Sequence, residues 1–192
     1  MIATDQVLHH HVGLAFVVIE CGDMKSPVNV VAAIGLALGG VFGLAGTVVT
    51  DQNLRAASWA IDGVALVVAT SLLALRFFRK GNDCVAAGFL VFAIGEGGML
   101  SGTAATLAGS VPSFAAGTAL WSAALLLTSV PREFAGWIRL VSIVGAILFA
   151  ITAARIFWGE QVLPTSSPLP FFAYPFLVLT FVGWIWTLLK AA

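Results

Sequence analysis

The chain has 192 residues, of which 60% are hydrophobic and 9% are charged, whereas a soluble domain carries roughly 25% charged residues. This composition excludes a soluble globular domain and predicts an integral membrane protein. Nine basic and nine acidic side chains give a formal net charge of zero. The chain therefore lacks the basic surface with which proteins bind nucleic acid, and we exclude nucleic acid as a partner.

Residues 1–27 are expected to form a cytoplasmic or interfacial segment. Their apolar run at 12–19 is too short to cross a membrane, which takes about 20 residues in a helix. The segment also holds side chains of the kinds that ligate transition metals: His9, His10, His11, Glu20, Cys21 and Asp23. Adjacent histidines on a helix point in different directions. We therefore favour a solvated or headgroup-facing segment, and we expect neither a metal site nor a cofactor.

Six apolar runs are long enough to cross a hydrocarbon core of about 30 Å as helices. They lie at about 28–50, 57–78, 84–108, 113–130, 136–158 and 170–190. The short connections predict that neighbouring helices run antiparallel. We expect an all-α integral membrane protein in which residues 28–192 form a single bundle of six transmembrane helices. A five-helix core with an added N-terminal helix is the alternative.

Basic residues predict the orientation of this bundle. Those near the span ends on one side are Lys25, Arg76, Arg79, Lys80, Arg132, Arg139 and Lys190, and those on the other are Arg55 and Arg155. Lys and Arg are enriched in cytoplasmic connections. We therefore expect both termini in the cytoplasm and the protein in the cell (inner) membrane.

Glycines form two stripes that predict close helix contacts. In the third run they recur at a spacing of seven, with one more on the same side: Gly88, Gly95, Gly102, Gly109 and Gly98. In the first run they recur at a spacing of four: Gly35, Gly39 and Gly43. Small residues let helix backbones approach closely in a membrane. The helix that packs on each stripe belongs either to the same molecule or to another one. Besides the lipid bilayer, a homo-oligomer or a partner membrane subunit therefore stays an open alternative.

Three ionisable residues fall within the spans: Asp62, Glu96 and Arg155. At about 1.5 Å per residue, Glu96 lies about 18 Å from the outer ends of the helices, Asp62 about 7–8 Å and Arg155 about 4–5 Å. A charged side chain within a membrane is costly and marks a functional site by default. If the second and fifth helices are neighbours, an Asp62–Arg155 ion pair would close the outer end of a polar cleft with Glu96 as its floor.

Structural roles are the alternative for all three. Arg155 can extend its long side chain to the outer interface, Asp62 can cap a helix, and Glu96 can be a hydrogen-bonded structural carboxyl group. Two hydroxyl residues join the candidate site: Thr103 lies on nearly the same helical face as Glu96, and Tyr174 lies at the outer start of the last span.

These features predict a carrier or channel for a proton, an ion or a small solute that uses a buried carboxylate. The alternative is a structural or accessory subunit, or a lipid-binding membrane module, without transport activity. An intramembrane enzyme is least favoured, because only Ser101 and Thr103 stand near Glu96 as further reactive groups on its helix and we assign no catalytic residue.

Overall fold

The computed structural model describes residues 27–190, which fold into six long α-helices and, in this range, no strand. In chain order they are α1 (Pro27–Val48), α2 (Gln52–Arg79), α3 (Asp83–Ser101), α4 (Val111–Ser129), α5 (Gly136–Phe157) and α6 (Tyr174–Lys190), with the short 3-10 helix η1 (Phe171–Ala173) before α6. Six segments are long and apolar enough to span a membrane, which confirms the predicted all-α six-helix membrane bundle. The histidine-rich stretch at 9–11 and its neighbours lie outside the described residues.

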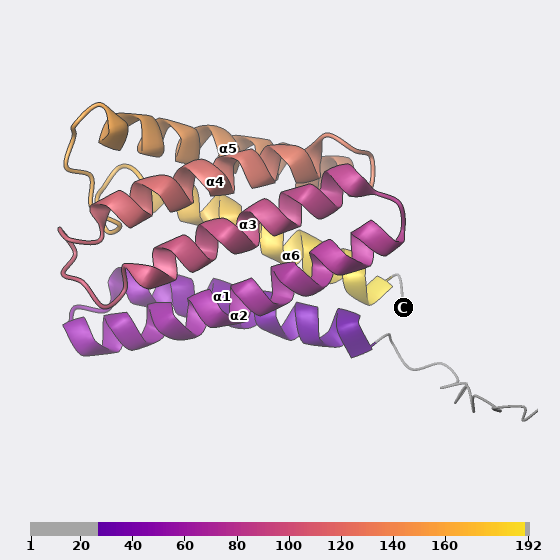
Figure 1. The fold of residues 1–192 in the computed structure, drawn as a ribbon, viewed down its shortest axis with the longest axis horizontal. Helices are drawn as coiled ribbons and strands as arrows, with labels where there is room; N and C mark the ends of the chain where they lie inside the picture. Colours follow the sequence, from indigo (N-terminus) through magenta and orange to yellow (C-terminus); the bar gives the residue numbers. More distant parts are fainter. Residues whose placement is uncertain (1–26, 191–192) are drawn as a thin grey trace, which may run out of the picture.

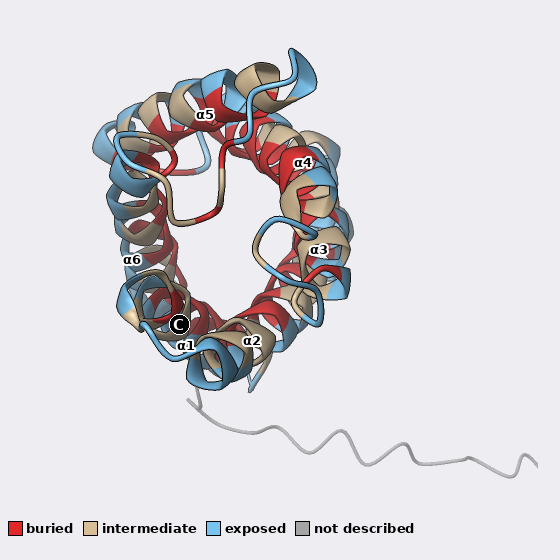
Figure 2. Ribbon diagram, turned by 90° about the vertical axis from the view of Figure 1, so that its left-hand side faces the viewer, coloured by how far each residue is buried: buried red, intermediate tan, exposed pale blue. Residues whose placement is uncertain are grey.

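The six helices stand in a closed ring (Figure 2). Each helix packs against the next one in the chain, and α6 closes the ring against α1. The start of α1 and the end of α6 lie at the same end of the ring (Figure 1), which we call the terminal end. The opposite end carries the connections α1–α2, α3–α4 and α5–α6, and we call it the loop end.

Two helices differ in length from the sequence-based expectation. α2 begins at Gln52 because the Asp51 side chain accepts a hydrogen bond of 2.8 Å from the Leu54 amide, which caps the first turn. α3 ends at Ser101, before the predicted end at 108. Around this end the Ser101 and Thr103 hydroxyls donate to carbonyls of the last turn, a local bonding that competes with helix continuation. Hydrophobicity alone predicted neither the earlier start of α2 nor the earlier end of α3, because both depend on side-chain hydrogen bonds.

The glycine stripe of α1 receives side chains of α2. A β-carbon at Gly35 would stand 2.8 Å from the Cβ of Ala69, and one at Gly43 would stand 2.9 Å from an oxygen of Asp62. A β-carbon at Gly39 would overlap Leu66. This stripe is therefore a contact within one chain.

The predicted stripe of α3 is correct in part. β-Carbons at Gly88 and Gly95 would stand 2.7 and 2.9 Å from side chains of α4, and one at Gly102 would overlap Ser113. Gly98 has no atom within 4 Å of its β-carbon position, so it does not belong to the contact. Gly109 lies in the α3–α4 connection because α3 ends early.

Aromatic side chains fill the ring toward its terminal end. Phe134, from the α4–α5 connection, is buried and has its ring centroid 5.9 Å from that of Phe77 and 6.1 Å from that of Trp184. Phe89 of α3 touches Trp184 of α6, the helix opposite in the ring, with 4.7 Å between centroids. We call Phe77, Phe89, Phe134 and Trp184 the aromatic plug.

Candidate functional site

A cavity of about 240 Å³ occupies the loop-end half of the ring. One water molecule needs at least about 10–15 Å³ of such space, so the cavity has room for several. Its wall comes from α1, α2, α3, α4, α6 and the connections at the loop end. Exposed residues such as Gln52, Asn53 and Ala104 line its mouth, whereas buried Leu66, Trp121 and Phe181 line its inner part.

One face of α2 runs down the cavity wall. It presents Arg55 near the mouth, then Trp59, Asp62 and Leu66, a spacing of four, three and four residues that keeps side chains on one helical face. Arg55 donates two hydrogen bonds, of 2.6 and 3.1 Å, to the carbonyl of Val49 just after α1. Arg55 was predicted on the outer side, but neither Arg55 nor Trp59 was predicted as a site residue, although their spacing from Asp62 places all three on one helical face.

The Asp62 carboxyl group lies between the cavity and α1. The residue is 8% exposed, and its Oδ1 has no hydrogen-bond partner within the described part of the chain. Its Oδ2 is 2.9 Å from the position of a β-carbon at Gly43. The missing side chain of Gly43 therefore makes the room in which this carboxyl group sits.

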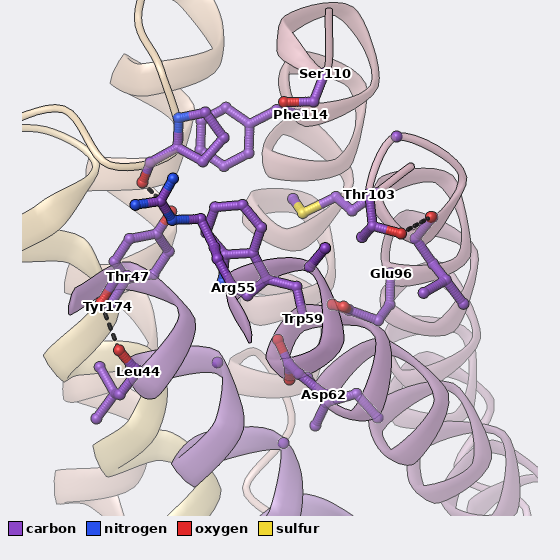
Figure 3. A pocket seen from close by; sticks show the side chains of 18 of the residues that line it. Leu44, Thr47, Arg55, Trp59, Asp62, Glu96, Thr103, Ser110, Phe114 and Tyr174 are labelled. Carbon is purple, nitrogen blue, oxygen red and sulfur yellow. Dashed lines mark hydrogen bonds between the residues drawn. The ribbon is translucent and has the colours of Figure 1, made fainter. Parts of the chain in front are cut away.

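Glu96 lies one helix further round the ring, on α3. It is 3% exposed, and its Oε2 also has no hydrogen-bond partner among residues 27–190. Its Oε1 lies 3.5 Å from the position of a β-carbon at Gly63 of α2. Figure 3 shows the carboxyl groups of Asp62 and Glu96 pointing into the same part of the cavity from adjacent helices.

Trp121 of α4 stands beside Glu96 in the cavity wall. Its indole ring stacks on Phe92 with 5.5 Å between centroids, and its buried N–H lies near the Glu96 carboxyl group without forming a hydrogen bond of ordinary geometry. Leaving a buried donor or acceptor unpaired costs about 1–3 kcal/mol. Three such atoms belong to residues of α2, α3 and α4 that line one cavity, which makes this cavity the candidate site.

Tyr174 and Thr103 both line the cavity, as expected for site residues. The Tyr174 hydroxyl donates a 2.8 Å hydrogen bond to the carbonyl of Pro164, which ties the α5–α6 connection to the start of α6 beside the cavity. The Thr103 hydroxyl donates to Leu100 of its own chain segment at 2.8 Å. The Tyr174 hydroxyl therefore holds two parts of the wall together, and both hydroxyl oxygens keep acceptor capacity.

Arg155 does not pair with Asp62. Its Nε donates a 2.7 Å hydrogen bond to Glu160, in the connection that follows α5, and the ion pair is partly exposed. α5 lies apart from α2 in the ring, and Arg155 is not among the described residues that line the cavity. The predicted Asp62–Arg155 ion pair does not form, because Glu160, five residues further along the chain, is the nearer carboxylate partner of Arg155.

The chemistry of the site is that of hydrogen bonding and charge. In the part of the chain that the structure describes, no three His, Cys, Asp or Glu side chains come close enough together to hold a metal ion. The cavity offers carboxyl acceptors, one indole donor and aromatic walls. Comparison of the chain with protein-family models, with curated proteins and with solved structures gives no match. The site is therefore interpreted from its own residues.

Proposed function

We propose that the protein is a carrier or channel for a small solute, and that the solute passes beside Asp62 and Glu96. The observation that carries the proposal is the pair of buried carboxyl groups with unpaired oxygens on one cavity, inside a ring of six membrane-spanning helices. Ionisable residues within spans are costly to keep and line substrate or ion pathways in membrane proteins.

The shape of the ring interior supports passage along its axis. The cavity reaches the loop end, where its lining residues are exposed. Beyond its inner part, the aromatic plug closes the ring toward the terminal end. A site open to one side and closed to the other is one of the two states that an alternating-access carrier or a gated channel needs.

The distribution of basic residues supports an outward-facing mouth. Six of them gather at the terminal end within the described residues: Arg76, Arg79, Lys80, Arg132, Arg139 and Lys190. By the preference of Lys and Arg for the cytoplasmic side, the terminal end faces the cytoplasm. The solute would then meet the carboxyl pair from outside the cell, at the depth where substrates are bound in many transporters.

The test is flux into proteoliposomes made with the full chain. Proton flux is followed with an enclosed pH-sensitive dye, and solute flux is followed by osmotic swelling with small neutral and charged solutes. We expect flux above that of protein-free vesicles, and at least a tenfold loss in Glu96→Gln and Asp62→Asn, because each exchange removes a buried charge-assisted contact. Glu160→Gln is the matched control, since this carboxylate pairs with Arg155 away from the cavity.

Flux that stays at the wild-type level in both cavity variants would refute the proposal.

The alternative function is an accessory or lipid-binding role. It requires glycine faces that are free to receive a partner helix or an acyl chain. α1 directs its stripe at α2, and α3 directs Gly88 and Gly95 at α4. No flux of any solute, together with copurification of a fixed lipid or a second subunit, would establish that alternative.

A further inference from the structure

We propose that the cavity binds a small organic monocation of the ammonium type, with its charged group beside Asp62 and Glu96. This inference rests on the proposed transport function and names the class of solute. It follows from the charges, the hydrogen-bonding groups and the aromatic surface that line the cavity.

The charges of the lining leave room for one positive charge. Among the described lining residues, the side chains that carry full charges at neutral pH in water are Asp62, Glu96 and Arg55. Arg55 stands two helical turns from Asp62, about 10 Å along the axis, and its guanidinium is engaged with the Val49 carbonyl. Asp62 and Glu96 are buried carboxyl groups on adjacent helices, and two such groups do not both ionise unless a cation stands beside them. A monocation therefore stabilises the ionised pair, whereas an anion would be repelled by it.

The carboxyl groups of the lining fit a donor-rich guest. Asp62 and Glu96 are acceptors when ionised, and both residues line the cavity from adjacent helices. An ammonium group offers N–H donors without any acceptor. Hydrogen bonds between such a donor and a carboxylate are roughly twice as strong as neutral ones. The deep part of the cavity thus matches an ammonium group.

Aromatic residues make up much of the remaining wall. They are Trp59, Phe114, Trp121, Tyr174 and Phe181. Cations are attracted to the faces of aromatic rings, and this is how proteins recognise organic ammonium ions. Divalent metal ions instead require about six or more oxygen ligands, and this wall is mostly apolar. Its aromatic surface and the size of the cavity therefore favour a cation with a small hydrocarbon group.

Equilibrium binding to the purified full chain in detergent tests this inference without requiring flux. Three probes of equal chain length differ in charge: propylammonium, propionamide and propionate. We expect propylammonium to bind at least about tenfold more tightly than propionamide, as charged hydrogen bonds predict, and propionate to show no binding. Glu96→Gln and Asp62→Asn should each weaken propylammonium binding about tenfold or more. Glu160→Gln should leave the affinity unchanged.

The outcomes separate this inference from the proposed function. The ammonium class would be overturned by equal affinity for propionamide and propylammonium, or by wild-type propylammonium affinity in both cavity variants. The transport function would stand even then if a neutral solute showed flux that depends on Glu96. Carboxyl-dependent propylammonium binding without flux would keep the site and overturn transport. Variants are compared only when they elute as the wild type does and keep its helical circular dichroism. If both carboxyl variants fail to fold, the affinities of the wild type for the three probes decide, and equal affinity for the amine and the amide would overturn the inference.

Discussion

The carboxyl group of Asp62 on α2 lies directly against Gly43 on α1, with 2.9 Å between Oδ2 and the position that a β-carbon would take. Glu96 on α3 lies 3.5 Å from the corresponding position at Gly63 on α2, an ordinary contact distance. Asp62 thus occupies space left by a glycine on the preceding helix of the ring. Gly43 positions this acid, because a larger residue would drive the carboxyl group out of place.

The exchange Gly43→Ala should therefore impair the site more than the fold. The added methyl group would meet Asp62 Oδ2 at 2.9 Å and its Cγ at 3.2 Å, so the carboxyl group must shift into the cavity. Overpacking of this kind costs about 1–3 kcal/mol of stability, and we expect solute flux or binding to fall by at least about tenfold, since a displaced carboxylate loses a charge-assisted contact.

Gly145→Ala on α5 is the control, because Gly145 is not among the described residues that line the cavity. Its β-carbon would stand 3.5 Å from Phe176 and 3.6 Å from Leu125, ordinary contact distances. Flux and thermal unfolding of this variant should match the wild type. Equal behaviour of the two alanine variants would contradict a positioning role for Gly43.

Trp121→Phe should separate stability from function. Phenylalanine keeps an aromatic ring against Phe92 and removes the unpaired indole N–H. A buried unpaired donor costs about 1–3 kcal/mol, so the variant should be as stable as the wild type or up to about 1 kcal/mol more stable in thermal unfolding. If the N–H serves the guest, flux or binding falls nonetheless. A large loss of stability would show that the N–H has a structural partner.

The sequence was sufficient for the class of fold and for part of the site. Apolar runs of membrane-spanning length define the six helices without reference to tertiary contacts, and the cost of Glu96 and Asp62 in a span singles them out. Arg155 was misassigned because ion pairing depends on which helices are neighbours, and the ring separates α5 from α2. Trp121 gave no signal of its own, because an aromatic residue in an apolar run is ordinary until the structure shows it in the cavity wall beside Glu96.

Glu160→Gln tests the corrected partner of Arg155. The pair lies at the loop end with both side chains substantially exposed, 40% for Arg155 and 51% for Glu160. Exposed ion pairs contribute little to stability, and this pair does not touch the cavity. The thermal midpoint and the flux should both remain those of the wild type. If Glu160→Gln lost as much flux as Asp62→Asn, the Arg155–Glu160 pair would have to take part in solute passage.

Phe134→Ala should open the ring at its terminal end. Phe134 is 5% exposed and comes from the connection between α4 and α5, so its side chain enters the ring from the end and packs on Phe77, Phe89 and Trp184. Removing this side chain leaves a cavity in the aromatic plug. A Phe→Ala exchange in a packed core lowers the free energy of unfolding by about 3–5 kcal/mol. We expect faster osmotic flux with weaker discrimination between solutes, measured by vesicle swelling. Trp137→Ala, at the same end but 46% exposed, is the control and should change neither quantity. Wild-type discrimination in a folded Phe134→Ala variant would show that the barrier to passage lies elsewhere in the ring.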